Sequence, residues 1–272
     1  MRCQTAAREL CARVALGHTH VPMRPVVFTL LGQPVHAYFF FLSVGFTFAI
    51  LLAARRTYEE EIPIEEFLNM AIAIFAAAIV GSRAFFVWEA WDHYRGNPLE
   101  ILRFWHGGLA FYGGFTFGGV AGLAYILWAR LPIGRVTDLC APYIVLGHIF
   151  GKVGCFFHGC CYGKPTDGSW GFAFPGTAHD LLLRHPSQLY EFAGLIAIFV
   201  GLHLLRLRRP VPGTLIGVYL IAYGVLRFLL EYTRDDMVGP AFYGLYRYQW
   251  TSVAMASLGA LVLIRVRVWS RR

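Results

Sequence analysis

The sequence alternates between long apolar stretches and short polar connections. Each stretch has close to the ~20 residues that an α-helix needs to cross the hydrocarbon core of a bilayer. The stretches are Val35–Ala54, Phe67–Val87, Gly107–Trp128, Leu139–Phe157, Ser187–Leu205, Gly213–Leu230 and Trp250–Val268. Their apolar residues run continuously, without the alternation that the strands of a membrane β-barrel require. The pattern therefore predicts an all-α fold, a polytopic membrane helical bundle of about seven transmembrane helices.

Composition supports the membrane assignment. Hydrophobic residues make up 57% of the chain and charged residues 15%, with a mean hydropathy of +0.53, whereas soluble domains have roughly 25% charged residues. We expect residues 35–272 to form one transmembrane domain of seven helices, and residues 1–34 to form a poorly ordered N-terminal extension. The first apolar stretch ends in Arg55-Arg56 without a small-residue cleavage site. We therefore interpret it as an uncleaved span rather than a signal peptide.

The net charge of +8 comes mostly from arginines that flank the apolar stretches. Only Lys152 and Lys164 are lysine among the 24 basic residues, and the chain lacks the basic stripe that is typical of nucleic-acid binding. Arginine is densest in the short connections after the first, third and fifth stretches and at the C-terminal end. Because positive charge concentrates on the cytoplasmic side, we expect the N-terminus outside and the C-terminus inside. Membrane lipids, and no nucleic acid, are the partners that this charge pattern indicates.

Five charged residues lie within or at the ends of apolar stretches: Arg83, Lys152, Glu191, Arg227 and Glu231. A charge at membrane depth costs several kcal/mol, so such side chains normally face a polar cavity, a partner or a substrate. One interpretation is mutual ion pairing that holds helices together, as for Arg227 and Glu231 at helical i,i+4 spacing. Because the cations outnumber the anions, the group also indicates an anionic ligand near the outer face, with a lipid phosphate as the first candidate.

Two glycine-rich runs stand out. The first, HGGLAFYGG, extends from His106 to Gly114, and its small residues favour close approach of a neighbouring helix or of a ligand. The second, GKVGCFFHGCCYG, occupies residues 151–163. Its three cysteines and His158 supply the four ligands that zinc prefers, but adjacent cysteines rarely bind one ion together. A soft metal, a disulfide and buried or reactive thiols all stay open for this run, and we predict no cofactor.

The run RHPSQLYE at residues 184–191 begins the fifth apolar stretch. Proline in the first turn is an ordinary device for starting a helix, and so is a capping box between Ser187, or a neighbour, and Glu191. From its residues alone, this run predicts a helix start and no chemistry.

These same stretches resemble the bacterial prolipoprotein diacylglyceryl transferase family, from about Val35 onward. The motifs that carry the resemblance are RHPSQLYE at 184–191, the glycine run at 107–114, VHAY at 35–38, and YGVLRF at 223–228 with Glu231 and Arg234. The resemblance implies an enzyme of the bacterial cytoplasmic (inner) membrane. Its substrates would be phosphatidylglycerol and the lipobox cysteine of a prolipoprotein, and its products a diacylglyceryl thioether and glycerol phosphate.

The resemblance also implies roles for single residues. Arg227 matches an essential arginine that would neutralise the phosphate, Tyr38 matches a tyrosine that the family uses, and Gly163 keeps a signature glycine. Three positions depart from the signature. Lys152 replaces an arginine and loses its bidentate geometry, Cys155 replaces an asparagine, and Cys160 stands where a glutamate is usual.

A further departure concerns the base of the reaction. Tyr112 stands where the family has its catalytic-site histidine, and a phenol is a poor base at neutral pH. His106 and His158 are possible substitutes. We therefore hypothesise a catalytic set of Tyr112, Lys152, Arg227, His106 and His158. The hypothesised substrate-binding set is Tyr38, Arg83, Cys155, Gly163, Glu231 and Arg234, and no residue is assigned to a metal. The alternatives are a lipid-site protein with another acceptor or with cysteine-based thiol chemistry, and a non-catalytic lipid- or metal-binding protein.

Overall fold

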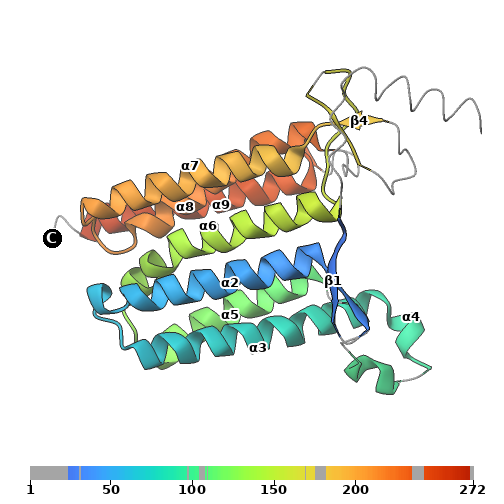
Figure 1. The fold of residues 1–272 in the computed structure, drawn as a ribbon. Coiled ribbons are helices and arrows are strands. Elements are labelled where there is room, and N and C mark those ends of the chain that lie inside the picture. Colours follow the sequence, from blue (N-terminus) through green and yellow to red (C-terminus); the bar gives the residue numbers. More distant parts are fainter. Residues whose placement is uncertain are drawn as a thin grey trace, which may run out of the picture. The chain divides into compact units, whose positions relative to one another are not determined.

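The computed structural model describes residues 24–30, 32–96, 98–103, 108, 110–168, 170–174, 182–234 and 242–269. The chain divides into two compact units, each of which is described by itself. The first unit contains residues up to Ala49 and from Cys140 onward, and the second contains Ile50–Leu139. Two helices contribute residues to both units: α2 (Ala37–Arg56) and α6 (Ile133–His158). Both are labelled in Figure 1.

The remaining elements of the first unit are β1 (Val26–Leu30), β2 (Gln33–His36), β3 (Phe172–Ala173), β4 (Leu183–Arg184), α7 (Ser187–Leu207), α8 (Thr214–Leu230), η4 (Glu231–Thr233) and α9 (Arg247–Trp269). Those of the second unit are η1 (Tyr58–Glu60), α3 (Ile64–Glu89), α4 (Trp91–Tyr94), η2 (Pro98–Leu102) and α5 (Phe111–Trp128). The strands form two short antiparallel pairs, β1 with β2 and β3 with β4.

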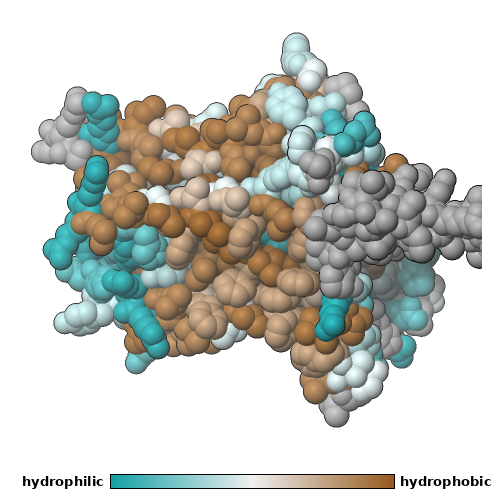
Figure 2. Space-filling model, turned by 45° about the horizontal axis from the view of Figure 1, so that its top comes forward, coloured by the Kyte–Doolittle hydropathy of each residue, from teal (hydrophilic) through white to brown (hydrophobic). Residues whose placement is uncertain are grey.

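Six of the described helices are long and apolar enough to cross a membrane: α2, α3, α6, α7, α8 extended by η4, and α9. The seventh expected stretch is observed as α5, whose 18 residues are close to the lower limit of about 17 for a span. Large hydrophobic side chains such as Phe75, Phe115 and Leu261 are exposed along these helices. Figure 2 shows hydrophobic residues along the helices and hydrophilic residues gathered at helix ends. The prediction of a polytopic helical bundle is confirmed.

The core of the first unit lies between α6, α7 and α8. Its buried residues recur at helical spacing on each helix, so that one face of each helix points inward. They are Ala141, Val145 and Ile149 on α6, Leu195 and Leu202 on α7, and Leu215 and Tyr219 on α8. On the other side of α8, Gly224 allows α9 to approach, because a Cβ at that position would lie 2.8 Å from the Ser252 carbonyl oxygen (Figure 1).

The second unit is held together by packing of α3 against α5. The glycine-rich run predicted close helix contact here, and the structure confirms it for Gly113. A Cβ on Gly113 would lie 2.6 Å from Cβ of Phe85, and one on Gly81 would meet the Gly113 carbonyl oxygen at 2.7 Å. Larger residues at either position would push the helices apart.

The polar start of α7 differs from its prediction. The helix begins at Ser187 after Pro186, as expected, but no side chain caps its first turn. The predicted capping box is therefore wrong, because both of its members are used elsewhere. The Ser187 hydroxyl pairs with the Thr233 hydroxyl at 3.2 Å, and Glu191 forms an ion pair with Lys152. Ahead of α2, the β1–β2 hairpin occupies part of the segment expected to be a poorly ordered extension, and residues 1–23 lie outside the described part of the chain.

Candidate active site

The polar residues of the first unit gather where α6, α7 and α8 meet. On α6, His148 and Lys152 are one turn apart and point to the same side chain, Glu191 of α7. Lys152 Nζ lies 2.7 Å from Glu191 Oε2, and His148 Nε2 lies 3.4 Å from Oε1. The Tyr223 hydroxyl of α8 donates to the same Oε1 at 3.1 Å. Glu191 is therefore the carboxylate that joins three helices, and its side chain is only 2% exposed.

A second ion pair runs along α8. Tyr223, Arg227 and Glu231 follow one another at i,i+4 spacing and so share a face of the helix. Arg227 Nη1 lies 2.8 Å from Glu231 Oε2, which confirms the pairing expected from the sequence. The Arg227 guanidinium also lies 5.3 Å from the ring centre of Tyr248 on α9. Glu231 is fully buried and Arg227 nearly so, so the guanidinium is fixed from two sides.

Gly163 joins the loop after α6 to the start of α7 and the end of α8. Its N–H donates to the His185 carbonyl oxygen at 2.8 Å, and its own carbonyl oxygen accepts from Arg184 Nη1 at 3.3 Å. It also pairs as an isolated β-bridge with Arg234. A Cβ here would overlap the Thr233 carbonyl oxygen and lie 2.5 Å from the Ser187 hydroxyl. The close approach therefore requires glycine.

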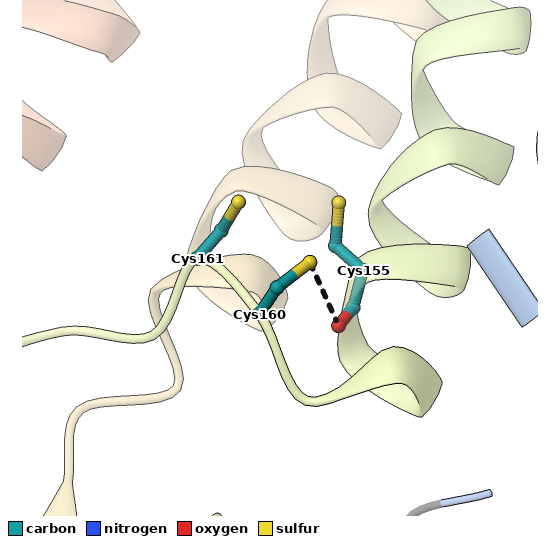
Figure 3. A group of neighbouring side chains, drawn as sticks. All are labelled: Cys155, Cys160 and Cys161. Atoms are coloured by element: carbon teal, nitrogen blue, oxygen red, sulfur yellow. Dashed lines mark hydrogen bonds between the residues drawn. The ribbon is translucent and has the colours of Figure 1, made fainter. Parts of the chain in front are cut away.

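Three thiols converge at the end of α6, and we call Cys155, Cys160 and Cys161 the cysteine cluster (Figure 3). All three sulfur atoms lie within 4.8 Å of one another, and none of the four described cysteines forms a disulfide. Cys160 Sγ lies 3.7 Å from the Cys155 carbonyl oxygen, and the Cys160 carbonyl oxygen accepts from Gln188 Nε2 at 2.6 Å. Cys155 is buried, Cys160 half-buried and Cys161 exposed.

The surroundings of Cys161 favour its thiolate. Hydrogen bonds from the Cys155 and Cys160 thiols, together with the positive charges of Lys152 and Arg234, lower the pKa of Cys161 below its ordinary value. A thiolate is both a nucleophile and a metal ligand, so the cysteine cluster is suited to either chemistry.

Two other predicted site residues border the cysteine cluster. Tyr38, in the first turn of α2, is within electrostatic range of all three thiols. Its backbone crosses α6 closely, because a Cβ on Gly154 would lie 3.0 Å from Tyr38 Cα. His158 ends α6 with its ring 5.7 Å from that of His36. The Nδ1 atoms of both histidines are buried without a hydrogen-bond partner among the described residues.

The remaining predicted residues belong to the second unit. Arg83 donates to the carbonyl oxygens of Ile101, Gly108 and Glu100 at 2.8, 3.1 and 2.6 Å. Its guanidinium also lies 5.2 Å from the ring centre of Tyr94. A cavity of about 270 Å³ is lined by Arg83, Phe86, His93, Tyr94, Glu100, Arg103 and Gly108. Tyr112 is half-exposed near the start of α5, and His106 lies outside the described residues.

Eight predicted site residues thus lie in the first unit, on helices α2, α6 and α8 and the segments that follow α6 and α8. They are Tyr38, Lys152, Cys155, His158, Gly163, Arg227, Glu231 and Arg234. The sequence did not predict His148 and Tyr223, whose side chains also contact the Glu191 carboxylate. Their signal was helical spacing, since each lies one turn before a predicted cation, Lys152 or Arg227.

Arg184 and Gln188 were also missed as site residues. Both sit in the run that was interpreted as a helix start. Their contacts go to the loop after α6, which lies more than 20 residues away in sequence. A contact with a backbone atom so far away in the sequence produces no local sequence pattern, so the sequence could not indicate these two roles.

The charges of this region suit an anion. Among the described side chains just named, Lys152, Arg184, Arg227 and Arg234 are cations, whereas the carboxylates are Glu191 and Glu231. The carboxylates fix two of the cations in place. These cations lie at one end of apolar helices, where a lipid phosphate lies in a bilayer.

Comparison with known proteins agrees with this chemistry. A family model described as prolipoprotein diacylglyceryl transferase matches residues 25–265. The phosphatidylglycerol–prolipoprotein diacylglyceryl transferase of Bordetella bronchiseptica is 34% identical over 256 residues, which cover 91% of this chain and 97% of that protein. The protein of the same name from Chlorobaculum tepidum is 33% identical over 93% of this chain and 92% of its own length. That from Cupriavidus metallidurans is 41% identical over 189 residues, and the match spans 66% of each protein. The chain belongs to the prolipoprotein diacylglyceryl transferase family.

Proposed function

We propose that the protein transfers the diacylglyceryl group of phosphatidylglycerol to the lipobox cysteine thiol of prolipoproteins. In this reaction a thiolate attacks the sp³ glyceryl carbon next to the phosphate. A C–S bond forms, the C–O bond breaks, and glycerol phosphate leaves with the electron pair. Such a site needs cations at the phosphate, a means of deprotonating the thiol, and access from the lipid. The region around α6, α7 and α8 supplies the cations.

Arg227 and Lys152 are the proposed phosphate ligands. Each cation is held by a buried carboxylate, Arg227 by Glu231 and Lys152 by Glu191, at 2.8 and 2.7 Å. The carboxylates restrict the positions of two long side chains, so less conformational entropy is lost when phosphate binds. Arg227 has further N–H donors beyond the one facing Glu231, and a guanidinium pairs with two phosphate oxygens at once.

Charge also changes during the reaction in a way that the site matches. Phosphatidylglycerol carries one negative charge on its phosphodiester, and the leaving glycerol phosphate carries two. Arg184 and Arg234, which flank Gly163, add positive charge to the same region. Fixed cations placed where negative charge develops stabilise the transition state more than the ground state.

The other predicted residues take part in the proposal as follows. Tyr38 lines the site beside the cysteine cluster, and Gly163 permits the close approach of the segments that carry Arg184 and Arg234. Cys155 stands on the site-facing side of α6, three residues after Lys152. His158 is a candidate acid or base whose Nδ1 has no hydrogen-bond partner among the described residues.

The candidates outside the first unit take part in the proposal as well. Tyr112 and His106 are proposed to take part in proton transfer, on the strength of the motif that contains them. Arg83 is proposed to contact the substrate from the cavity that it lines, while its three carbonyl partners hold it in place.

The protein is a multi-pass membrane protein, and the family places it in the bacterial inner membrane. We propose that its N-terminus lies outside and its C-terminus inside. Arg55 and Arg56 end α2, Arg206 ends α7, and Arg265 lies near the end of α9. These ends are the cytoplasmic ones under the positive-inside rule, and the cysteine cluster then lies at the outer end of α6. Reporter fusions at the C-terminus test this orientation. Activity of a fused reporter enzyme that functions only outside the cytoplasm would contradict it.

The buried Arg227–Glu231 and Lys152–Glu191 pairs at one end of the apolar helices carry the proposal. It is tested with purified protein in detergent, phosphatidylglycerol and a lipobox-containing peptide, with mass spectrometry to detect the thioether. We expect product from the wild type and from Arg265→Ala, an exposed arginine on α9, and none from Arg227→Ala. Folded wild-type protein that binds the lipid but yields no product would refute the proposal.

One observation favours an alternative acceptor. Cys161 is exposed and its thiolate is stabilised, so the protein's own thiol is a possible nucleophile. The same experiment without peptide distinguishes the two, because self-modification would add the diacylglyceryl mass to a peptide containing Cys161.

A further inference from the structure

The cysteine cluster brings three sulfur atoms to one point although two of its members are adjacent in sequence. In a regular helix or strand, neighbouring side chains point to different faces. Here the chain leaves α6 through Gly159, at a φ of +78°, and Cys161 itself adopts a left-handed φ of +63°. This backbone directs Cys160 and Cys161 toward the same space as Cys155 (Figure 3). The objection that adjacent cysteines rarely share one ion is thereby removed.

The spacing of the sulfur atoms fits a zinc ion. Zinc–sulfur bonds of about 2.3 Å in a tetrahedron place the sulfur atoms about 3.8 Å apart. The three sulfur atoms of the cysteine cluster already lie within 4.8 Å of one another. Rotation of side chains by small amounts is therefore enough to close the site, and the backbone is held by the bond from Gln188 to the Cys160 carbonyl oxygen.

The negative charge of such a site is reduced by two neighbouring cations. Three thiolates around Zn²⁺ carry one net negative charge, and a fourth thiolate adds another. Lys152 and Arg234 both act electrostatically on Cys161. Lys152 is also paired with Glu191, so the two cations reduce, without cancelling, the two negative charges of a four-thiolate zinc centre. This lowers the cost of holding the centre at the edge of the membrane.

The cysteine cluster supplies three ligands and leaves the fourth position open. Among the described residues, no histidine, aspartate, glutamate or further cysteine joins the group, and His158 faces His36 instead. Structural zinc sites have four protein ligands, whereas catalytic zinc sites have three and keep a position for water or substrate. Because Cys161 is exposed, the cysteine cluster is accessible from solvent.

We propose that Cys155, Cys160 and Cys161 bind a Zn²⁺ ion, and that the cysteine thiol of the acceptor occupies its fourth coordination position. This inference rests on the proposed function and names how that reaction activates its nucleophile. A thiol that coordinates zinc is deprotonated outright, so the residues proposed for proton transfer, Tyr112, His106 and His158, do not have to be strong bases. The zinc site therefore accounts for a chain in which a tyrosine stands where a histidine was expected.

The step balances as follows. The acceptor thiol displaces a zinc-bound water and releases its proton to solvent. The zinc-bound thiolate then attacks the glyceryl carbon, the C–S bond forms, and the C–O bond breaks with its electron pair on the phosphate oxygen. Glycerol phosphate leaves as a dianion near Arg227 and Lys152. The neutral thioether is a weak ligand, and water takes its place on the zinc.

Zinc binding is tested first, without turnover. Wild-type protein, purified in detergent under reducing conditions, is loaded with Zn²⁺, and bound metal is counted by elemental analysis. We expect one zinc per chain in the wild type and in Cys140→Ala, a cysteine of α6 outside the cluster. Cys155→Ala, Cys160→Ala and Cys161→Ala should each lower zinc affinity about tenfold or more. A wild type that holds no more zinc than the triple variant would overturn the proposal.

The open position is tested with the unaltered chain, which avoids variants that fail to fold. Cobalt replaces zinc, and the lipobox peptide is added while the sulfur-to-cobalt charge-transfer absorption is recorded. We expect the absorption to rise with the cysteine peptide and to stay constant with a peptide carrying serine in its place. No change with the cysteine peptide would overturn the role of the fourth position. A disulfide between two of the three cysteines, found by alkylation in intact membranes, would overturn zinc binding itself.

Turnover separates this inference from the proposed function. Chelation of zinc should lower thioether formation about tenfold or more, and Zn²⁺ but not Mg²⁺ should restore it. Undiminished transfer after zinc removal would overturn the inference and leave the proposed function standing. Zinc bound by the three cysteines, without product and without a spectral response to the peptide, would overturn both.

Discussion

Substitution of Gly163 by alanine is the sharpest test of how the site is assembled. The new Cβ would overlap the Thr233 carbonyl oxygen, and it would lie 2.5 Å from the Ser187 hydroxyl and 2.7 Å from Cβ of His185. Ordinary contacts begin at 3.4 Å, so the segments around Gly163 must separate by about 0.9 Å (3.4 minus 2.5) or more. The Thr233 carbonyl oxygen is a backbone atom, and Cβ of His185 is bonded directly to the backbone. Neither atom can rotate away as the end of a flexible side chain would.

The magnitude follows from that displacement. Overpacking of a tight site typically costs about 1–3 kcal/mol, and each kcal/mol lowers the unfolding temperature of a protein of this size by about 2–4 °C. The effect on activity should be larger, because a misplacement of about 1 Å in a catalytic arrangement costs on the order of 100-fold in rate. Gly163 links Arg184 to Arg234, so both cations move when the segments separate.

The assay combines thioether formation with thermal unfolding in detergent. Gly201→Ala is the matched control, since Gly201 lies in α7 and a Cβ at this position would have no neighbouring heavy atom within 4 Å. Alanine favours a helix over glycine, so the control should be as active as the wild type and slightly more stable. Wild-type activity and stability in Gly163→Ala would refute the reasoning.

Three further changes test individual contacts. Glu191→Gln leaves Lys152 without its charge partner in a buried setting and should lower the free energy of unfolding by about 3–5 kcal/mol. Lys152→Met combined with Glu191→Leu should recover much of that stability but should not recover thioether formation. Arg227→Lys keeps the charge but loses bidentate contact with phosphate, so thioether formation should fall at least about tenfold with a nearly unchanged unfolding temperature. Arg83→Gln removes donors from three carbonyl oxygens and should destabilise the protein by about 2–4 kcal/mol. A loss of lipid binding larger than the loss of stability explains would support the proposed contact of Arg83 with the substrate, and unchanged lipid binding would contradict that contact.

The helices were predictable because membrane spans depend on hydrophobicity alone. The stretch predicted at Ser187–Leu205 is observed as Ser187–Leu207, and that at Gly213–Leu230 as Thr214–Leu230. The largest difference is at α6, which begins at Ile133 rather than Leu139. Polar residues, among them Arg135 and Asp138, interrupt the hydrophobic pattern in this first turn and a half, but they do not interrupt the helix. Hydropathy thus marks the part of a helix inside lipid and omits its polar end.

The candidate site was predictable only in part, for a physical reason. Ion pairs within one helix, such as Arg227–Glu231, follow from i,i+4 spacing. Contacts between helices do not, and the sequence offered no way to know that Glu191 meets Lys152 rather than capping its own helix. The convergence of Cys160 and Cys161 depends on two residues with a left-handed φ, Gly159 and Cys161. Sequence spacing does not reveal such backbone conformations, so spacing alone argued against a shared site for the two thiols.

The proposed site also explains why carboxylates are acceptable beside a phosphate. Total charge stays constant during the reaction, because one negative charge moves from the acceptor sulfur to the departing phosphate oxygen. A stronger positive field over the whole site would stabilise the starting thiolate as much as the departing phosphate, so it would not lower the activation barrier. The reaction is accelerated when the surroundings of the phosphate are more positive than those of the acceptor sulfur. Glu191 and Glu231 fix Lys152 and Arg227 at the phosphate end. A zinc ion held by the three thiolates of the cysteine cluster would be net negative and would withdraw less electron density from the acceptor sulfur than a zinc ion with neutral ligands. The negative charge therefore moves away from the anionic surroundings of the acceptor sulfur and toward the phosphate oxygen beside Lys152 and Arg227.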